Sequence, residues 1–503
     1  MPGEAAALTA SRSLFGHPAG IATLFFVEMW ERASFYGMRA LLVLFLVSTA
    51  GGFGLDDRTA TAIYGLYNAG AYIVSLPGGW AADRLLGAQR AVLLGGGIIA
   101  VGHVLLGIAP SAPIFYLGLL VIVLGTGLLK PSVGVVVAAL YPEGGARRDA
   151  GFTLYYMGVN LGAFLGPLIC GALAQVYGWH AGFLAAAFGM SAGLAQFLVQ
   201  RRRLGEAGRQ PLPRERNASG AAAGRARRRS VQGLIAALAL LAVVVVLVWT
   251  GLIAVPPVVL QALAVGGISA VAVLYFAYLL IGAGLDPIER RRVLVVTVLF
   301  IASVLFWSGY EQAGSSFNLF AERYTDLALR GRHVPAAWFQ SLNPIFIITF
   351  APMFSALWIW LGRRQLDPSA PLKFVFGLAG MALGLLIMVG AARLAVSGQK
   401  VSMAWLTITY LIHTFGELCL SPVGNSAVTK LVPQRFAGQA LGLWFLSISL
   451  GNLLASRIAG EFVASDISGM PGAYLRIFWL GTVCAALLAL LTPLVRRWMG
   501  GVR

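Results

Sequence analysis

The sequence predicts an all-α polytopic membrane protein with 14 transmembrane helices. Hydrophobic residues make up 58% of the 503 residues, against about 45–50% in soluble domains. Charged residues make up only 11%, where roughly 25% is usual. Stretches of about 20 apolar residues, the length that crosses the hydrocarbon core, recur along the chain. This composition excludes a soluble globular protein and a disordered chain, and the low count of three cysteines excludes a secreted disulfide scaffold.

The apolar runs fall into two sets of six with an additional pair between them. The expected spans lie near 20–48, 60–82, 91–109, 114–139, 151–172, 181–200, 231–254, 257–284, 293–320, 337–361, 374–396, 402–429, 438–460 and 473–495. We therefore expect an N-terminal six-helix bundle in 1–200, a linker in 201–230, two extra helices in 231–284 and a C-terminal six-helix bundle in 285–503.

The distribution of lysine and arginine predicts the orientation. With an even number of spans and a cytoplasmic N-terminus, most positive charges fall in cytoplasmic segments, so both termini are expected there. The linker is rich in arginine, and we expect weak attraction to anionic membrane lipid. Aromatic residues do not interleave its arginines, which argues against nucleic-acid binding.

The turn after the second span supports this architecture. Residues 78–90 read GGWAADRLLGAQR and resemble the cytoplasmic loop motif of major facilitator transporters, in which Asp–Arg pairs latch neighbouring helices. The alternative is an ordinary charged helix end. Six plus six helices suggest the major facilitator fold, with substrate held at the midplane between the two bundles.

Ionisable side chains inside the spans are the main functional signal, because each costs about 2.5–3.5 kcal/mol on lenient scales. In the first span, Glu28, Glu31 and Arg32 share one helix face, and Arg39 lies two turns further along it.

Three further charges lie in other spans: Lys130, Glu311 and Glu417. Carboxylates and cations from both bundles can pair in more than one way, and protonation of a carboxylate would release its cation. The alternative is a set of permanent ion pairs that only fix helix packing.

Two segments resemble signatures of the proton-dependent oligopeptide transporter (POT) family. Residues 28–37 read EMWERASFYG, similar to the family pattern ExxERFxYYG, and residues 152–163 read FTLYYMGVNLGA. Ala33 replaces the usual aromatic residue and Phe35 the usual tyrosine, so one hydroxyl is missing. The resemblance covers nearly the whole chain, and the extra helix pair is typical of bacterial members.

The resemblance implies a proton-coupled importer of di- and tripeptides in the bacterial inner membrane, with no cofactor other than the proton. Glu28, Glu31, Arg32 and Glu311 would couple transport to protons. Arg32 and Lys130 would bind the peptide carboxylate, and Glu417 its amino group. Further residues implied in substrate binding are Tyr36, Tyr72, Tyr156, Asn160, Trp307, Asn343, Ser421 and Trp444.

Two of the predicted ion pairs suggest gates. Arg39 and Glu311 are expected to close the extracellular mouth, and Lys130 with Glu417 the cytoplasmic mouth.

The alternatives to a peptide importer are a major facilitator carrier for another zwitterion or an anion such as nitrate, a drug exporter, and, from other classes, a membrane enzyme or a channel. The sequence contains no HExxH or P-loop motif, so we expect no enzyme, and no obligate protein partner is evident.

Overall fold

A computed structural model describes residues 13–14, 16–143, 145–211, parts of 231–254, 255–462 and 467–500. The linker from 212 to 230 and most of the first extra span lie outside the described residues. The long helices are α2 (Gly20–Val47), α3 (Asp57–Ile73), α5 (Ala88–Ile108), α6 (Ala112–Ala139), α7 (Gly145–Tyr177), α8 (Trp179–Gln200), α10 (Pro257–Ala277), α11 (Pro287–Tyr310), α13 (Leu342–Arg363), α14 (Ala370–Val396), α15 (Met403–Leu431), α16 (Ala437–Ala459) and α17 (Met470–Met499).

Short elements join these helices. They are α4 (Ser75–Ala81), α12 (Ser316–Tyr324), the π turns η1 (Ala82–Leu86) and η3 (Tyr278–Gly282), and the 3₁₀ turns η2 (Arg201–Leu204), η4 (Glu311–Gly314), η5 (Ala336–Ser341), η6 (Gln434–Phe436) and η7 (Ile467–Gly469). The strands are pairs of residues: β1 (Ser13–Leu14) with β2 (His17–Pro18), β3 (Thr325–Asp326) with β6 (Val401–Ser402), and β4 (Ala328–Leu329) with β5 (Arg332–His333).

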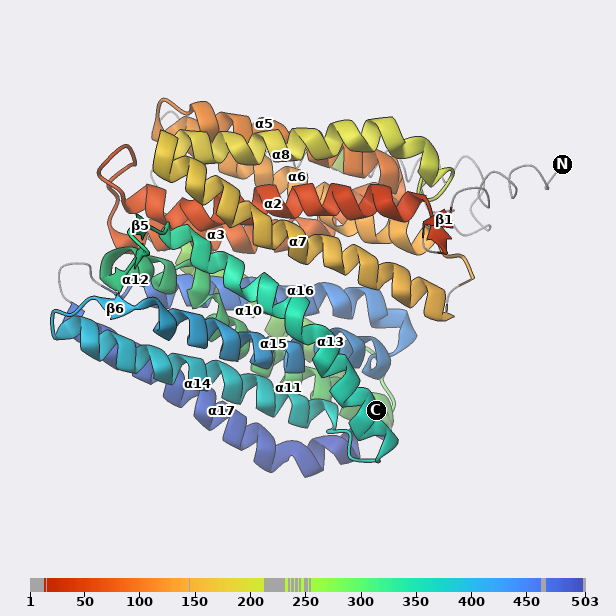
Figure 1. Cartoon of the computed structure of the whole chain (residues 1–503). Helices are drawn as coiled ribbons and strands as arrows, with labels where there is room; N and C mark the ends of the chain where they lie inside the picture. The colour runs from red at the N-terminus through yellow and green to blue at the C-terminus, as the bar shows by residue number, and fades with distance from the viewer. Residues whose placement is uncertain are drawn as a thin grey trace. The chain divides into compact units, whose positions relative to one another are not determined.

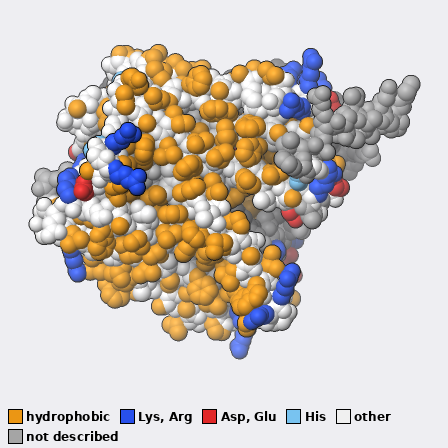
Figure 2. Space-filling view, viewed as in Figure 1, with side chains coloured by type: hydrophobic (Ala, Val, Ile, Leu, Met, Phe, Trp, Pro, Cys, Tyr) orange, Lys and Arg blue, Asp and Glu red, His pale blue; other side chains and the backbone are white. Residues whose placement is uncertain are grey.

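The chain is an all-helical polytopic membrane protein, as the sequence predicts. Eleven helices in the described part are long and apolar enough to cross a membrane. Figure 2 shows hydrophobic side chains over most of the face in view, with Lys and Arg side chains near its margins. Such an apolar surface suits contact with lipid rather than water.

The described chain divides into two compact units. Unit 1 comprises residues 1–35, 73–162 and 183–256, and unit 2 comprises residues 36–72, 163–182 and 257–503. In unit 2, helix α14 packs along both α15 and α17 (Figure 1). The helices α2, α7 and α8 contribute to both units, because each is cut by the division, which also separates the last residue of α3 from the rest of that helix.

Two expected spans are interrupted. The span expected over 60–82 is divided at Val74 between α3 and α4. The sequence suggests a continuous helix over 293–320, but α11 ends at Tyr310 and a 3₁₀ turn from Glu311 to Gly314 precedes α12. The carbonyl of Ala313, freed by the break, accepts hydrogen bonds from Gln340 Nε2 (2.6 Å) and Tyr410 Oη (3.0 Å). A broken helix is tolerated in a membrane when neighbours satisfy its backbone in this way.

Local capping explains where α11 begins. The Asp286 side chain accepts hydrogen bonds from the amides of Ile288 and Glu289, and the Glu289 carboxylate accepts a hydrogen bond from the Asp286 amide. Pro287 occupies the first turn, where its missing N–H costs nothing.

The loop of residues 78–90 turns at Gly87, whose φ is 82°. In the described part of the chain Asp83 forms no ion pair, so the Asp–Arg latch that the motif suggests is not seen. Burial raises the pKa of the Asp83 carboxyl, and neighbouring Arg84 opposes this rise.

Candidate functional site

A buried cluster of two carboxylates and one guanidinium lies on α2 in unit 1. Arg32 Nε donates to Glu28 Oε1 at 2.8 Å and lies 2.9 Å from Glu31 Oε2. Exposure is 1% for Glu28, 1% for Glu31 and 5% for Arg32. The positive charge of Lys130 on α6 also acts on Glu31. Helical spacing of three and four residues brings these groups together, as expected from the sequence.

Helix α7 packs closely on α2 beside this cluster. A Cβ on Gly162 would lie 2.1 Å from the Met29 carbonyl oxygen, so only glycine allows this approach. On the same helix Asn160 is 5% exposed and donates to the Tyr156 carbonyl at 2.9 Å. Tyr155 of this helix interacts electrostatically with Glu28, Glu31 and Arg32. Sequence reasoning chose Tyr156, which is 47% exposed, and missed Tyr155 in the same signature.

A second cluster, in unit 2, joins Arg39 to Glu311. Arg39 Nη2 pairs with Glu311 Oε2, and both side chains are at most 10% exposed. Arg39 Nε donates to the Tyr64 hydroxyl at 2.6 Å, and the guanidinium lies 5.6 Å from the ring centres of both Tyr36 and Tyr64. The pair is therefore enclosed by aromatic rings that favour a cation.

Glu417 lies in a hydrogen-bonded network of unit 2. Its Oε2 accepts from Tyr310 Oη at 2.6 Å and from Asn343 Nδ2 at 2.9 Å, and Asn343 also donates to Thr414 at 3.1 Å. The Tyr310 ring stacks on those of Phe306 and His413, at 5.4 and 5.9 Å between centroids. Sequence reasoning predicted Asn343 beside Glu417 but missed Tyr310, although it precedes Glu311 directly.

The predicted aromatic lining residues of unit 2 are largely packed. Trp307 is 8% exposed and Trp444 is 3% exposed. Trp444 lies edge-on to Phe374 at 6.1 Å, and Trp307 lies edge-on to Tyr310 at 5.2 Å. Tyr72 and Ser421 are half-buried. Their contact with substrate remains a prediction, as does that of Tyr36.

A further ion pair, absent from the sequence reasoning, joins α3 to α12 in unit 2. The two terminal guanidinium nitrogens of Arg323, Nη1 and Nη2, donate to the two carboxylate oxygens of Asp57, each at 2.6 Å. Lys400 Nζ donates to the Arg323 carbonyl at 2.8 Å, and the β3–β6 pairing lies directly after α12. We call the Asp57–Arg323 pair the outer latch, because both residues are in segments predicted to face outward.

Neutral hydrogen bonds accompany the two ion pairs. Asn318 Nδ2 donates to the Ala40 carbonyl of α2 at 2.8 Å, and Ser341 Oγ to the Phe164 carbonyl of α7 at 2.7 Å. The parts of α2, α3 and α7 that belong to unit 2 are thus tied to η4, α12 and η5.

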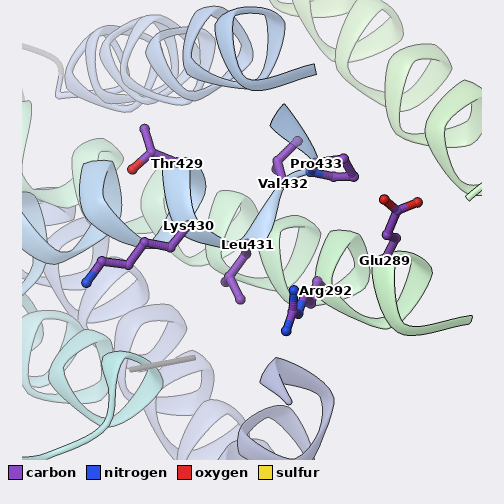
Figure 3. A pocket seen from close by; sticks show the side chains of 7 residues that line it. All are labelled: Glu289, Arg292, Thr429, Lys430, Leu431, Val432 and Pro433. Carbon is purple, nitrogen blue, oxygen red and sulfur yellow. The ribbon is translucent and has the colours of Figure 1, made fainter. Parts of the chain in front are cut away.

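Figure 3 shows a pocket of about 450 Å³ that lies away from these clusters, at the start of α11 and the end of α15. It is lined by Glu289, Arg292, Thr429, Lys430, Leu431, Val432 and Pro433. Because Glu289 is paired with Arg435 at 3.0 Å and no predicted site residue lines this pocket, we do not assign the substrate to it.

Comparison with known proteins identifies the family of this chain. A family model described as "PTR2: POT family" matches residues 89–477. The chain belongs to the POT family. This POT family member is a transporter and not an enzyme, which confirms that expectation.

Its relatives match over almost their full length. It is 42% identical to "Peptide transporter YePEPT" of Yersinia enterocolitica subsp. palearctica serotype O:3 (strain YE-P4), over 98% of this chain and 97% of the relative. It is 33% identical to a di-/tripeptide transporter of Lactococcus lactis subsp. cremoris, over 98% of each chain.

Solved structures agree. A peptide transporter POT in complex with sulfate matches with a TM-score of 0.90 at 37% identity, over 99% of both chains. A POT family transporter in complex with 5-aminolevulinic acid matches at 0.86 and 33%, over 96% of this chain and 98% of that one.

Proposed function

We propose that this POT family member imports di- and tripeptides together with protons across the bacterial inner membrane, by alternating access. Both termini would lie in the cytoplasm, as the distribution of arginine favours. The observation that carries the proton coupling is the Glu28–Glu31–Arg32 cluster, in which two buried carboxylates approach the same guanidinium nitrogen at 2.8 and 2.9 Å.

The cluster can exchange a proton for a substrate charge. Two buried carboxylates beside one guanidinium repel each other, and a proton on either removes that repulsion. Protonation also loosens one carboxylate from Arg32, so the guanidinium becomes able to bind an incoming peptide carboxylate. Lys130 would share that carboxylate and make recognition depend on two cations.

Glu417 is suited to bind the peptide ammonium. Among the described residues, the hydrogen bonds to this carboxylate from Tyr310 and Asn343 both end on Oε2, so Oε1 remains to accept from an ammonium group. A dipeptide or tripeptide is a zwitterion about 7–11 Å long. Cations in the N-terminal half and a carboxylate in the C-terminal half would bind its two charged ends. Recognition would then depend little on the side chains of the peptide.

The Arg39–Glu311 pair and the outer latch would form the extracellular gate, and this gate would be closed when both pairs are formed. Lys130 and Glu417 would form the cytoplasmic gate. In each transport cycle the ion pairs of one gate would break, while substrate and proton compete for the charged groups of the other.

The test is uptake of radiolabelled dialanine into proteoliposomes under an inward proton gradient, with and without an uncoupler. We expect accumulation that the uncoupler abolishes. Glu28→Gln and Glu31→Gln should abolish accumulation, whereas Glu461→Gln, at a 57% exposed glutamate paired with Arg476, is the matched control and should retain it. Folded protein without any uptake would refute the peptide assignment and direct the search to other zwitterions or to anions such as nitrate.

A further inference from the structure

The helix α10, the second of the extra pair, carries a buried polar side chain to which none of the roles proposed above is assigned. Gln261 is 3% exposed and donates through Nε2 to Ser456 Oγ of α16 at 2.8 Å, with a longer contact of 3.4 Å to the Leu453 carbonyl. A polar side chain in a membrane helix is costly unless it faces a protein partner. Its position therefore fixes how α10 sits on α16.

The acceptor of this hydrogen bond is also the place where α16 meets α3. A Cβ on Gly65 would lie 1.8 Å from Ser456 Oγ, so only glycine at position 65 allows the observed contact. Ser456 is 1% exposed, and its own hydroxyl donates to the Leu453 carbonyl at 3.0 Å. The hydroxyl is thus held between Gln261 on one side and the backbone of α3 on the other.

Both neighbours of this contact lead to the Arg39–Glu311 pair. Gly65 follows Tyr64, whose hydroxyl accepts from Arg39 at 2.6 Å. On α16, the Ala455 carbonyl accepts from Gln312 Nε2 at 3.0 Å, and Gln312 follows Glu311. A shift of Ser456 would therefore displace both partners of the ion pair.

We propose that α10 stabilises the closed extracellular gate and that Gln261 is a positioning residue for it. Gln261 orients the Ser456 hydroxyl, which sets the contact of α16 with Gly65 and so keeps Tyr64 and Gln312 where they hold Arg39 and Glu311. The proposal rests on the gating role of the Arg39–Glu311 pair. It gives the extra helices a function: they bias the equilibrium between open and closed outer states without contacting substrate.

The test measures how often the outer side opens. Ser341 is 3% exposed and bonds to Phe164 of α7, so a cysteine there is accessible from outside only when this contact separates. The Ser341→Cys reporter is placed in a full-length chain that carries Cys170→Ala, Cys419→Ala and Cys484→Ala. Its rate of labelling by a membrane-impermeant thiol reagent is measured in intact cells.

Gln261→Met keeps the length of the side chain and removes the hydrogen bond. Hydrogen bonds between membrane helices correspond to a shift of about threefold in equilibrium, so we expect labelling about threefold faster. The matched control is Tyr275→Phe, which removes another hydrogen bond between α10 and α16, the 2.7 Å contact to Gln439 at the opposite end of these helices. It should label at the parent rate.

Ser456→Ala provides a second route if Gln261→Met folds poorly. It should also accelerate labelling, and the double variant should label no faster than either single one, because both remove the same bond. Parent-rate labelling of both single variants, or equal acceleration by Tyr275→Phe, would overturn the proposal. The variant Glu311→Gln distinguishes the gating role of the Arg39–Glu311 pair from the role of α10. If Glu311→Gln also leaves the labelling rate unchanged, the Arg39–Glu311 pair is not the gate. If Glu311→Gln alone accelerates labelling, only the role of α10 is refuted.

Discussion

Replacing Asp57 by asparagine tests gating separately from proton coupling, because the outer latch shares no residue with the Glu28–Glu31–Arg32 cluster. Each of its two hydrogen bonds is charge-assisted and 2.6 Å long. Asparagine keeps one acceptor oxygen and turns an amide donor toward the other guanidinium nitrogen, so one bond is lost and the other weakened. A bond to a charged group contributes about 1.5–3 kcal/mol.

Solvent reduces this value, since the Arg323 side chain is 25% exposed and that of Asp57 is 7% exposed. We take about 2 kcal/mol for the closed state, which corresponds to an opening equilibrium raised by about 30-fold at 1.36 kcal/mol per factor of ten. The Ser341→Cys reporter, labelled from outside, measures this change directly. Labelling within twofold of the parent would refute the latch.

The exchange Asp57→Arg with Arg323→Asp is the control for charge pairing. It should recover part of the slow labelling, although an arginine in the first turn of α3 opposes the helix dipole. If the exchanged pair labels as fast as Asp57→Asn, the effect comes from local disruption of α3 and not from the ion pair.

Three further predictions concern the clusters themselves. Glu28→Gln or Glu31→Gln should abolish proton-driven uptake but spare counterflow, which needs no net proton movement. If uptake and counterflow were lost equally, the proton-coupling site would have to lie elsewhere. Tyr64→Phe removes one hydrogen bond to Arg39 and should raise outer labelling about 3- to 10-fold, and an unchanged rate would show that ring contact alone positions Arg39. Glu417→Gln should abolish stabilisation of the purified protein by dialanine in a thermal shift assay, with Asn343→Ala weakening it less; full retention of the shift would exclude Glu417 as the amine receptor.

Much of the fold can be predicted from the sequence, because the length of each span and the positions of its charges are properties of short stretches of the chain. The apolar runs predict the long helices, and spacing on α2 predicts that Glu28, Glu31 and Arg32 meet. The pairing of Arg39 with Glu311 could be expected because both are in-span charges near the outer side of their spans, and an in-span charge needs a partner.

The remaining features depend on contacts between distant segments. Asp57 and Arg323 are ordinary loop-end charges in the sequence and become a pair only when α3 and α12 meet. Tyr310 is one tyrosine among 15, and its bond to Glu417 joins residues 107 positions apart. The sequence gives only a weak indication of the helix break at Glu311, namely Gly314 followed by two serines. A window of 20 residues around this point is still apolar enough to predict a continuous transmembrane helix.

The helix α2 carries the Glu28–Glu31–Arg32 cluster in one unit and Arg39 in the other, with no interruption from Gly20 to Val47. Arg32 and Arg39 are therefore separated by a fixed length of about 10.5 Å and nearly the same azimuth. Inserting or deleting one residue between them would rotate one arginine by about 100° relative to the other. A point substitution in this stretch keeps the spacing of the two arginines along α2, whereas an insertion or a deletion changes both their spacing and their relative orientation on the helix.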